Sequence, residues 1–287
     1  PTNMSHLICS NNRDIVARHA SALKSIPMMD KIFPKYAWML QKDTKWLVDN
    51  ALANFDRMMR FLHEADLVQV STESLRKVYS GWGVRATTLP NLEKLSEWSH
   101  VARTPLLNRV VIGWSGSFSH YFTDLKPIAR QVTQVLNENP DAHLHLIGLV
   151  EAKELFASAP KDRAFSSEWT DWETYKSQIA EFDITLAPSF ASRKFEEGKS
   201  PIRDQQSWML GIPVVASPLT YKETVGLGGG GYIANKPNDW YELLSKLAKD
   251  SNLRRELGGR GKQWVLANRV LDDKINLWHD AYARLMQ

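Results

Sequence analysis

The chain has 287 residues, 43% of them hydrophobic and 24% charged, and this composition excludes intrinsic disorder for most of its length. At about 150 residues per domain, the length predicts roughly two domains. The net charge of +4 favours anionic partners such as nucleotides, phosphates or anionic lipids. Lysine and arginine are scattered without a dense basic run, which argues against duplex nucleic acid as a partner.

Cysteine content and hydropathy bear on the compartment. Cys9 is the single cysteine, which excludes an intrachain disulfide and any zinc site built from a cysteine cluster. No apolar run approaches the ~20 residues of a membrane-spanning helix, and residues 1–14 lack the apolar core of a signal peptide. We therefore expect a cytoplasmic protein, for which peripheral contact with a membrane stays open.

The N-terminal part is expected to be mostly helical. Apolar residues recur at helical spacing within residues 28–64. The other expected elements are short strands at 6–9 and 67–71, a helix at 72–79 capped by Thr72, a turn and short strand within 81–91, and a polar connector over 92–108.

From Arg109 onward, apolar strands alternate with helices. Strands are expected at 109–114, 143–148, 183–188, 212–217 and within 228–233, and helices at 125–136, 150–157, 171–181, 200–210, 237–249 and 251–267. This alternation predicts an α/β fold with a Rossmann-like parallel sheet covered by helices on both faces. Because ligands bind such sheets at the C-terminal ends of the strands, the loops at 114–124, 148–151, 188–200 and 217–230 are the candidate sites.

Two of these loops carry patterns suited to anions. In the loop after residue 113, Gly116 and Ser117 would let backbone N–H groups approach a phosphate, although a glycine turn without a ligand fits equally well. In FEEGKSPIR at 195–203, Ser200 is expected to cap a helix with Pro201 in its first turn. Lys199 would then stand at a helix N-terminus and favour an anion, and the alternative is a capped helix with a solvated lysine.

Residues 195–217, FEEGKSPIRDQQSWMLGIPVVAS, resemble the donor-binding signature of GT-B glycosyltransferases of the GT4-like group, also known as glycosyltransferase group 1. That signature reads Phe-x-Glu-Gly-Lys-Ser-Pro-x-Lys, then a helix bearing a glutamate, then Gly-x-Pro-Val-Val-Ala-Ser. Further segments resemble the family in the same order: 65–75, 89–91, 114–120, 221–225, the glycine turn at 228–231, Trp240 and 250–258. The resemblance covers about residues 65–287 and is strongest over 109–265.

The resemblance implies a nucleotide-sugar donor held by the C-terminal domain. It assigns Glu197, at the donor sugar, and Lys199, at the diphosphate, as catalytic. The substrate-binding residues that it implies are Gly116, Ser117, His120, Ser200, Pro201, Arg203 and Gln206, the last at the ribose hydroxyls. A lysine and backbone N–H groups can stabilise a leaving nucleoside diphosphate without a metal, which suits the retaining transfer that the family performs.

Two departures from the family pattern stand out. Gln206 occupies the position of the usual helix glutamate, so a charge-assisted bond to the ribose is lost. Fewer than 110 residues precede the Rossmann-like part, whereas the family has a full N-terminal domain. We therefore expect a GT-B-like protein with a reduced, helix-rich acceptor-side part at 1–105, or one whose early strands are missing. The Rossmann-like domain would span 106–269, and a C-terminal helix at 270–287 would pack back on the N-terminal part.

The leading functional hypothesis is a glycosyltransferase that moves a sugar from a nucleotide sugar to a glycan, lipid-linked or other acceptor, without a cofactor or metal. A non-catalytic nucleotide-sugar or glycan-binding subunit of a larger assembly is the alternative, favoured by Gln206 and the short N-terminal part. A glycosyltransferase that modifies nucleic acid is supported by the basic charge alone. His143 and His145 alternate on one expected strand, but no carboxylate or cysteine pattern nearby supports a metal pair.

Overall fold

The computed structural model describes residues 17, 42–116, 124–148, 154–190 and 193–286. It divides the chain into two compact units, one made of residues 1–70 and 76–87 and the other of residues 71–75 and 88–287. Residues 88–105, which the sequence assigned to the N-terminal part, thus belong to the second unit. The strand expected at 6–9 lies outside the described residues.

The first unit is built around one long helix and a small sheet. Helix α5 (Thr44–Glu64) begins where the Asp43 carboxylate accepts a hydrogen bond from the Trp46 backbone N–H at 2.6 Å. Its buried residues recur at helical spacing: Leu47, Val48, Ala51, Phe55 and Leu62. Strands β1 (Val68–Val70) and β2 (Ala86–Thr88) form a two-stranded sheet, and helix α6 (Glu73–Gly81) connects them.

The second unit contains a six-stranded parallel sheet. Its strands are β3 (Val110–Ser115), β4 (Ala142–Ile147), β5 (Ala164–Ser167), β6 (Ile184–Ala187), β7 (Val214–Ala216) and β8 (Gly231–Ile233), in the spatial order β5-β4-β3-β6-β7-β8. Strands β3 and β4 pair in register from Val110 with Ala142 to Ser115 with Ile147. Every residue of both strands is buried, which explains the nearly continuous apolar sequence of β3.

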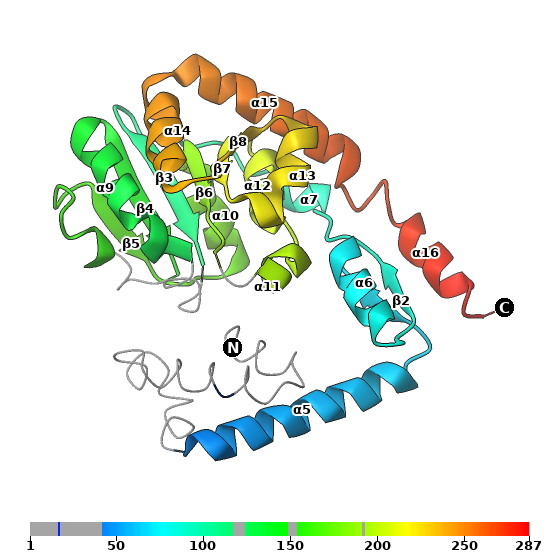
Figure 1. Ribbon diagram of the computed structural model, residues 1–287. Helices are drawn as coiled ribbons and strands as arrows, with labels where there is room; N and C mark the ends of the chain where they lie inside the picture. Colours follow the sequence, from blue (N-terminus) through cyan, green and yellow to red (C-terminus); the bar gives the residue numbers. More distant parts are fainter. Residues whose placement is uncertain (1–16, 18–41, 117–123, 149–153, 191–192, 287) are drawn as a thin grey trace. The chain divides into compact units, whose positions relative to one another are not determined.

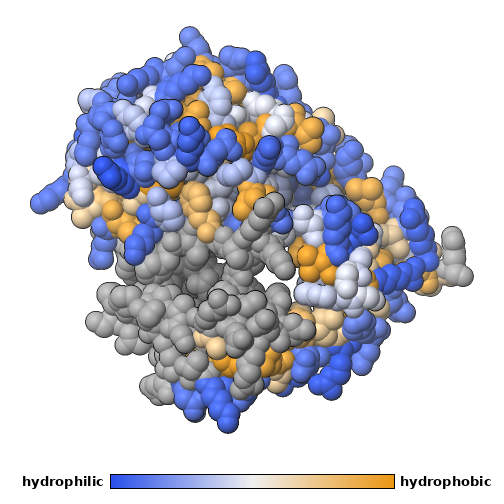
Figure 2. Space-filling model, viewed as in Figure 1, coloured by the Kyte–Doolittle hydropathy of each residue, from blue (hydrophilic) through white to orange (hydrophobic). Residues whose placement is uncertain are grey.

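Helices cover both faces of this sheet (Figure 1). On one face, α9 (Ala129–Glu138) packs beside α14 (Pro237–Lys249). On the other face lie α10 (Trp172–Ala180), α12 (Ile202–Met209) and α13 (Pro218–Gly228), and α15 (Ser251–Asn268) packs against α12 and α13. Hydrophilic residues cover most of the upper rim of Figure 2, where α14 and α15 lie. The predicted α/β class with a Rossmann-like sheet is therefore confirmed.

Several local expectations need correction. Strand β5 was not expected from the sequence, nor was the short helix α11 (Arg193–Gly198) that precedes Lys199. Helix α12 begins at Ile202, with Pro201 at its cap position and no side-chain cap, so Ser200 does not cap it as predicted. The expected polar connector contains helix α7 (Leu95–Trp98), and its Trp98 is buried in the core of the second unit.

The segments that precede and follow the Rossmann-like part of the chain are hydrogen-bonded to each other. The Glu93 backbone N–H donates to the Arg269 carbonyl at 2.8 Å, and the Leu271 N–H donates to the Glu93 carbonyl at 2.9 Å. Helix α16 (Asn276–Ala283) follows, and none of its residues is buried. The return of residues 270–287 to the N-terminal part stays a prediction. No helix in the described part of the chain is both long and apolar enough to span a bilayer.

Candidate functional site

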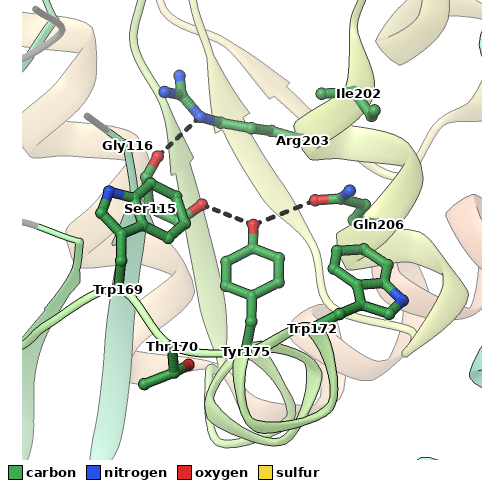
Figure 3. A pocket seen from close by; sticks show the side chains of 9 residues that line it. All are labelled: Ser115, Gly116, Trp169, Thr170, Trp172, Tyr175, Ile202, Arg203 and Gln206. Atoms are coloured by element: carbon green, nitrogen blue, oxygen red, sulfur yellow. Dashed lines mark hydrogen bonds between the residues drawn. The ribbon is translucent and has the colours of Figure 1, made fainter.

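A pocket of the second unit lies where the sheet topology changes direction. Strands β3 and β6 are neighbours, but the chain runs outward from β3 to β4 and β5 and, on the other side, from β6 to β7 and β8. Ligands of open α/β sheets bind in the crevice at such a switch point. A pocket of about 570 Å³ lies there (Figure 3), lined by Ser115, Gly116, Trp169, Thr170, Trp172, Tyr175, Ile202, Arg203 and Gln206.

The ends of β3 and β4 are packed too tightly for side chains. A Cβ on Gly116 would lie 2.4 Å from the Trp114 ring and 3.1 Å from Nη2 of Arg203. Gly148, at the end of β4, has a φ of +101°, and a Cβ there would lie 2.5 Å from the Trp169 ring and 2.7 Å from the Gly116 carbonyl oxygen. Both positions therefore require glycine, and of the two Gly116 lines the pocket.

A buried chain of hydrogen bonds crosses the pocket (Figure 3). The Tyr175 hydroxyl lies 3.0 Å from Oγ of Ser115 and donates to Oε1 of Gln206 at 3.2 Å. Burial raises the pKa of Tyr175 above its ordinary value of 10, so the hydroxyl keeps its proton. The three side chains come from β3, α10 and α12, and the chain of bonds joins these elements across the switch point.

Arg203 supplies a fixed positive charge. Its Nε donates to the Ser115 carbonyl at 3.1 Å, and its guanidinium lies 5.6 Å from the centre of the Trp114 ring and 3.5 Å from the buried Asp124 carboxylate. Burial lowers the pKa of Arg203, but Tyr221 and Asp124 outweigh this effect and hold it above its ordinary value. Among the lining residues that the structure describes, Arg203 carries the charge and none is acidic.

Aromatic side chains form the opposite wall. The Trp172 and Tyr175 rings stack with centroids 5.5 Å apart, and Trp169 lies 5.9 Å from Tyr175. The Trp169 side chain remains 52% exposed. Asp171 caps α10, because its carboxylate accepts a hydrogen bond from the Thr174 N–H at 2.9 Å. The wall offers flat apolar surface to a ligand.

Lys199 belongs to a second polar cluster, beside the loops after β6 and β7. Its Nζ donates to Oγ of Ser189 at 2.8 Å and lies 3.1 Å from the fully buried Glu196 carboxylate. Ser189 and Thr220 also donate to this carboxylate. Glu196 therefore ties the two loops together. Lys199 follows the C-terminal end of α11 and does not stand at the first turn of α12, which corrects the predicted helix N-terminus.

The structure brings together three of the predicted site residues. Gly116, Arg203 and Gln206 line the pocket, whereas Glu197, Lys199, Ser200 and Pro201 are not among its lining residues. Ser117 and His120 lie outside the described residues. Six lining residues were not predicted from the sequence: Ser115, Trp169, Thr170, Trp172, Tyr175 and Ile202. Two tryptophans in the polar stretch 168–173 were the available signal, but the strand before that stretch went unrecognised.

His143 and His145 have structural roles. Nδ1 of His143 lies 2.8 Å from the Asp141 carbonyl, and Nε2 of His145 lies 3.0 Å from Oγ of Ser167. Burial lowers the pKa of His145 to about 4, so the ring is neutral near pH 7. Within the described residues, no group of three or more His, Cys, Asp or Glu side chains is placed to hold a metal ion.

No protein-family model and no curated protein matches the sequence. Similar solved structures do exist. Sucrose-phosphate synthase from Thermosynechococcus elongatus aligns with 95% of this chain and 72% of its own, at 15% identity and a TM-score of 0.62. S. aureus TarM, solved with fondaparinux, α-GlcNAc-glycerol and UDP, aligns with 79% of this chain at 14% identity and a TM-score of 0.64. This chain spans 46% of the TarM chain.

Anabaena HepE, solved with UDP-glucose, aligns with 81% of this chain and 68% of its own, at 12% identity and a TM-score of 0.65. Identities this low establish the fold alone. The structural neighbours are GT-B glycosyltransferases, so the fold class predicted from the sequence agrees with them.

Proposed function

We propose that this protein is a glycosyltransferase of the GT4-like group that moves a sugar from a nucleotide-sugar donor to an acceptor. The pocket at the switch point is the observation that carries the proposal. It combines the Arg203 guanidinium and the glycine-lined backbone of Gly116 with an aromatic wall, and no carboxylate lines its described part. A nucleoside diphosphate presents the complementary groups, because it has a flat base at one end and a dianionic diphosphate at the other.

Size and structural likeness support this choice. The volume of about 570 Å³ falls within the range of about 300–1,000 Å³ that is typical of small-molecule sites. TarM was solved with UDP and HepE with UDP-glucose, and the chain shares their fold. We propose a uridine diphosphate sugar as the donor, with its base against Trp169 and its diphosphate toward Arg203 and Gly116.

The catalytic roles that we propose follow the resemblance in the sequence. Glu197 would orient the donor sugar, and Lys199 would stabilise charge on the leaving diphosphate. By the same resemblance, Ser117, His120, Ser200 and Pro201 would contact the donor. Two cationic side chains would supply positive charge, so we propose transfer without a metal ion, with the retention that the resemblance implies. Activity that is lost with a chelator and restored by magnesium or manganese would contradict the metal independence.

The acceptor is proposed to be a glycan or a lipid-linked sugar, met in the cytoplasm or at a membrane surface. A second function is favoured by Gln206, which lines the pocket in place of a glutamate. In that case the chain would be a non-catalytic subunit that binds a nucleotide sugar or a glycan. The enzyme and a subunit that binds a nucleotide sugar both predict nucleotide binding, but only the enzyme consumes its donor.

Titration calorimetry of the full chain with UDP, GDP and ADP tests the proposal, followed by incubation with the matching nucleotide glucose. We expect UDP to bind with a Kd in the micromolar range and UDP-glucose to be hydrolysed slowly without an acceptor. UDP binding without hydrolysis or transfer across a panel of glycan acceptors would favour the subunit. The absence of binding to all three nucleotides would contradict both the enzyme and a subunit that binds a nucleotide sugar.

A further inference from the structure

The amide of Gln206 is held in one orientation at the wall of the pocket. Tyr175 keeps its proton and donates it to Oε1 of Gln206, and the Tyr175 oxygen lies 3.0 Å from the Ser115 hydroxyl. Oε1 of Gln206 therefore has its donor already. Figure 3 shows Oε1 turned toward Tyr175 and Nε2 on the other side of the amide. The amide can meet a ligand with the N–H groups of Nε2.

The acceptors near the amide are neutral. The Ser115 carbonyl already accepts a hydrogen bond from Nε of Arg203. No acidic residue is present among the described residues that line the pocket. A ligand hydroxyl placed beside Gln206 would therefore find neutral oxygens and no carboxylate to accept its proton.

Gln206 and Arg203 act from the same side. They lie three positions apart on α12, which places them on one helix face, and both line the pocket. The Arg203 charge and the Gln206 N–H groups therefore border the same pocket. A cation and an N–H donor each favour an oxygen that carries negative charge, so an anionic ligand in the pocket suits both.

We infer that Gln206, positioned by Tyr175, donates a hydrogen bond to a phosphate oxygen of the ligand and does not accept one from the ribose hydroxyls. The inference rests on the proposed function and deepens it by naming the ligand group that Gln206 contacts. If Gln206 contacts the phosphate in this chain, a carboxylate in its place would put negative charge beside that phosphate and weaken its binding.

Gln206→Glu tests the sign of this contact in the full chain, because glutamate has nearly the same shape and replaces the donors with charged acceptors. Titration calorimetry with UDP and with inorganic diphosphate should show at least a tenfold weaker Kd for both. Gln263→Glu, an exposed position on α15, is the control and should bind as the wild type does. Tighter or unchanged UDP binding by Gln206→Glu would overturn the inference, since a carboxylate improves contact with ribose hydroxyls.

Gln206→Leu removes the N–H donors without adding charge. Comparing its binding of UDP and of inorganic diphosphate shows whether Gln206 contacts the phosphate or the ribose. The inference predicts a similar loss, roughly three- to tenfold, for UDP and for inorganic diphosphate. A loss confined to UDP would assign Gln206 to the nucleoside and would overturn the inference. Thermal unfolding of each variant verifies that the fold is intact.

A double-mutant cycle tests the positioning role of Tyr175. Tyr175→Phe keeps the ring of the wall and removes the hydroxyl, and it should weaken diphosphate binding about three- to tenfold. In the Gln206→Leu background the same change should add little, because Tyr175 acts through Gln206. An equal loss in both backgrounds, or no loss in either, would contradict positioning. Tyr241→Phe, whose hydroxyl bonds to the exposed Glu138, is the matched control.

These results separate the inference from the proposed function. The variants could bind diphosphate more weakly than a wild-type protein that binds diphosphate but transfers no sugar. That result would support the inference and contradict glycosyl transfer. A wild-type protein that binds neither UDP nor diphosphate would overturn both. Sugar transfer that survives together with UDP binding in Gln206→Glu would overturn the inference alone.

Discussion

Tryptophan has different roles in two regions of the second unit. In the interior, the Trp208 side chain is fully buried, its indole N–H donates to the Gly230 carbonyl at 2.9 Å, and its ring meets Trp264 edge-on at 5.7 Å. At the C-terminal edge of the sheet, Trp169 and Trp172 are 52% and 39% exposed and line the pocket. One region uses the indole to fill space, and the other presents it to a ligand.

The neighbours of each ring explain the difference. A Cβ on Gly230 or Gly261 would lie 2.4 Å or 2.5 Å from Trp208, so the backbone there closes on the indole. The pocket tryptophans instead lie beside open space and polar groups. Trp98 connects the two regions, since it belongs to the core and meets Trp172 edge-on at 5.7 Å. A tryptophan is thus structural or ligand-facing according to what surrounds it.

The largest expected effect is the loss of stability when the interior tryptophan, Trp208, is replaced. Trp208→Ala removes a fully buried indole between α12, α13 and α15 and should lower the free energy of unfolding by about 3–5 kcal/mol. Trp169→Ala, at the half-exposed position, should change it by less than about 1 kcal/mol. Urea denaturation of both variants measures the contrast. Similar losses in the two variants would show that the pocket wall is part of the core.

The next largest effects are expected on ligand binding and sugar transfer, when the proposed catalytic residues Lys199 and Glu197 are replaced. Lys199→Ala removes a charge-assisted contact and should weaken diphosphate binding about ten- to a hundredfold, or roughly 1.5–3 kcal/mol. Glu197→Ala should reduce sugar transfer while diphosphate binding stays nearly intact. Calorimetry and a transfer assay measure the two effects, with the exposed Lys262→Ala as the control. Wild-type diphosphate affinity in a folded Lys199→Ala protein would remove Lys199 from the donor site.

Glu93, which is hydrogen-bonded to Trp98, should make the free energy of unfolding depend on pH. Burial raises the pKa of Glu93 to about 6, although the hydrogen bond from Nε1 of Trp98 at 2.8 Å acts to lower it. A folded-state pKa above the unfolded value of 4.5 gives stability that is complete below pH 4.5 and is lost as pH rises through about 6. Glu93→Gln should remove this loss, which is about 2 kcal/mol. Urea denaturation at pH 4.5 and pH 7 measures it, and an equal pH response in both proteins would contradict it.

The smallest expected effect is the loss of UDP affinity when the half-exposed Trp169 ring is removed. Trp169→Ala should weaken UDP binding by about five- to tenfold, near the lower end of the energy of a base stacked on an aromatic side chain. Its effect on inorganic diphosphate should be negligible, because the diphosphate has no base. Calorimetry with both ligands measures the ratio. Equal losses for the two ligands would show that Trp169 acts on the shape of the pocket and not on the base.

The sequence predicted the parallel sheet well because buried strands such as β3 and β7 lie in apolar runs. It missed β5, whose sequence AFSS is short, polar and half-buried at the edge of the sheet. Missing β5 also hid the pocket wall, since Trp169 and Trp172 follow that strand. Sequence order cannot reveal a contact such as Ser115 with Tyr175, because these residues lie far apart in the chain and meet only through the strand order.

The glycosyltransferase-like motif was more informative about chemistry than about local geometry. Arg203 and Gln206 line the pocket, but Lys199 pairs with Glu196 at 3.1 Å, a contact that only the fold reveals. The predicted cap at Ser200 was wrong because helix α11 takes up residues 193–198 and α12 starts at Ile202. Glu197 and Lys199 remain proposals for catalysis.

A crystal structure of the full chain with bound UDP tests the central claim most directly. The account predicts the nucleotide in the pocket at the end of β3, with the diphosphate within hydrogen-bond distance of Arg203 and Nε2 of Gln206 and the base against Trp169. UDP ordered elsewhere on the chain, or bound with its diphosphate remote from Arg203, would contradict the assignment of this pocket as the donor site.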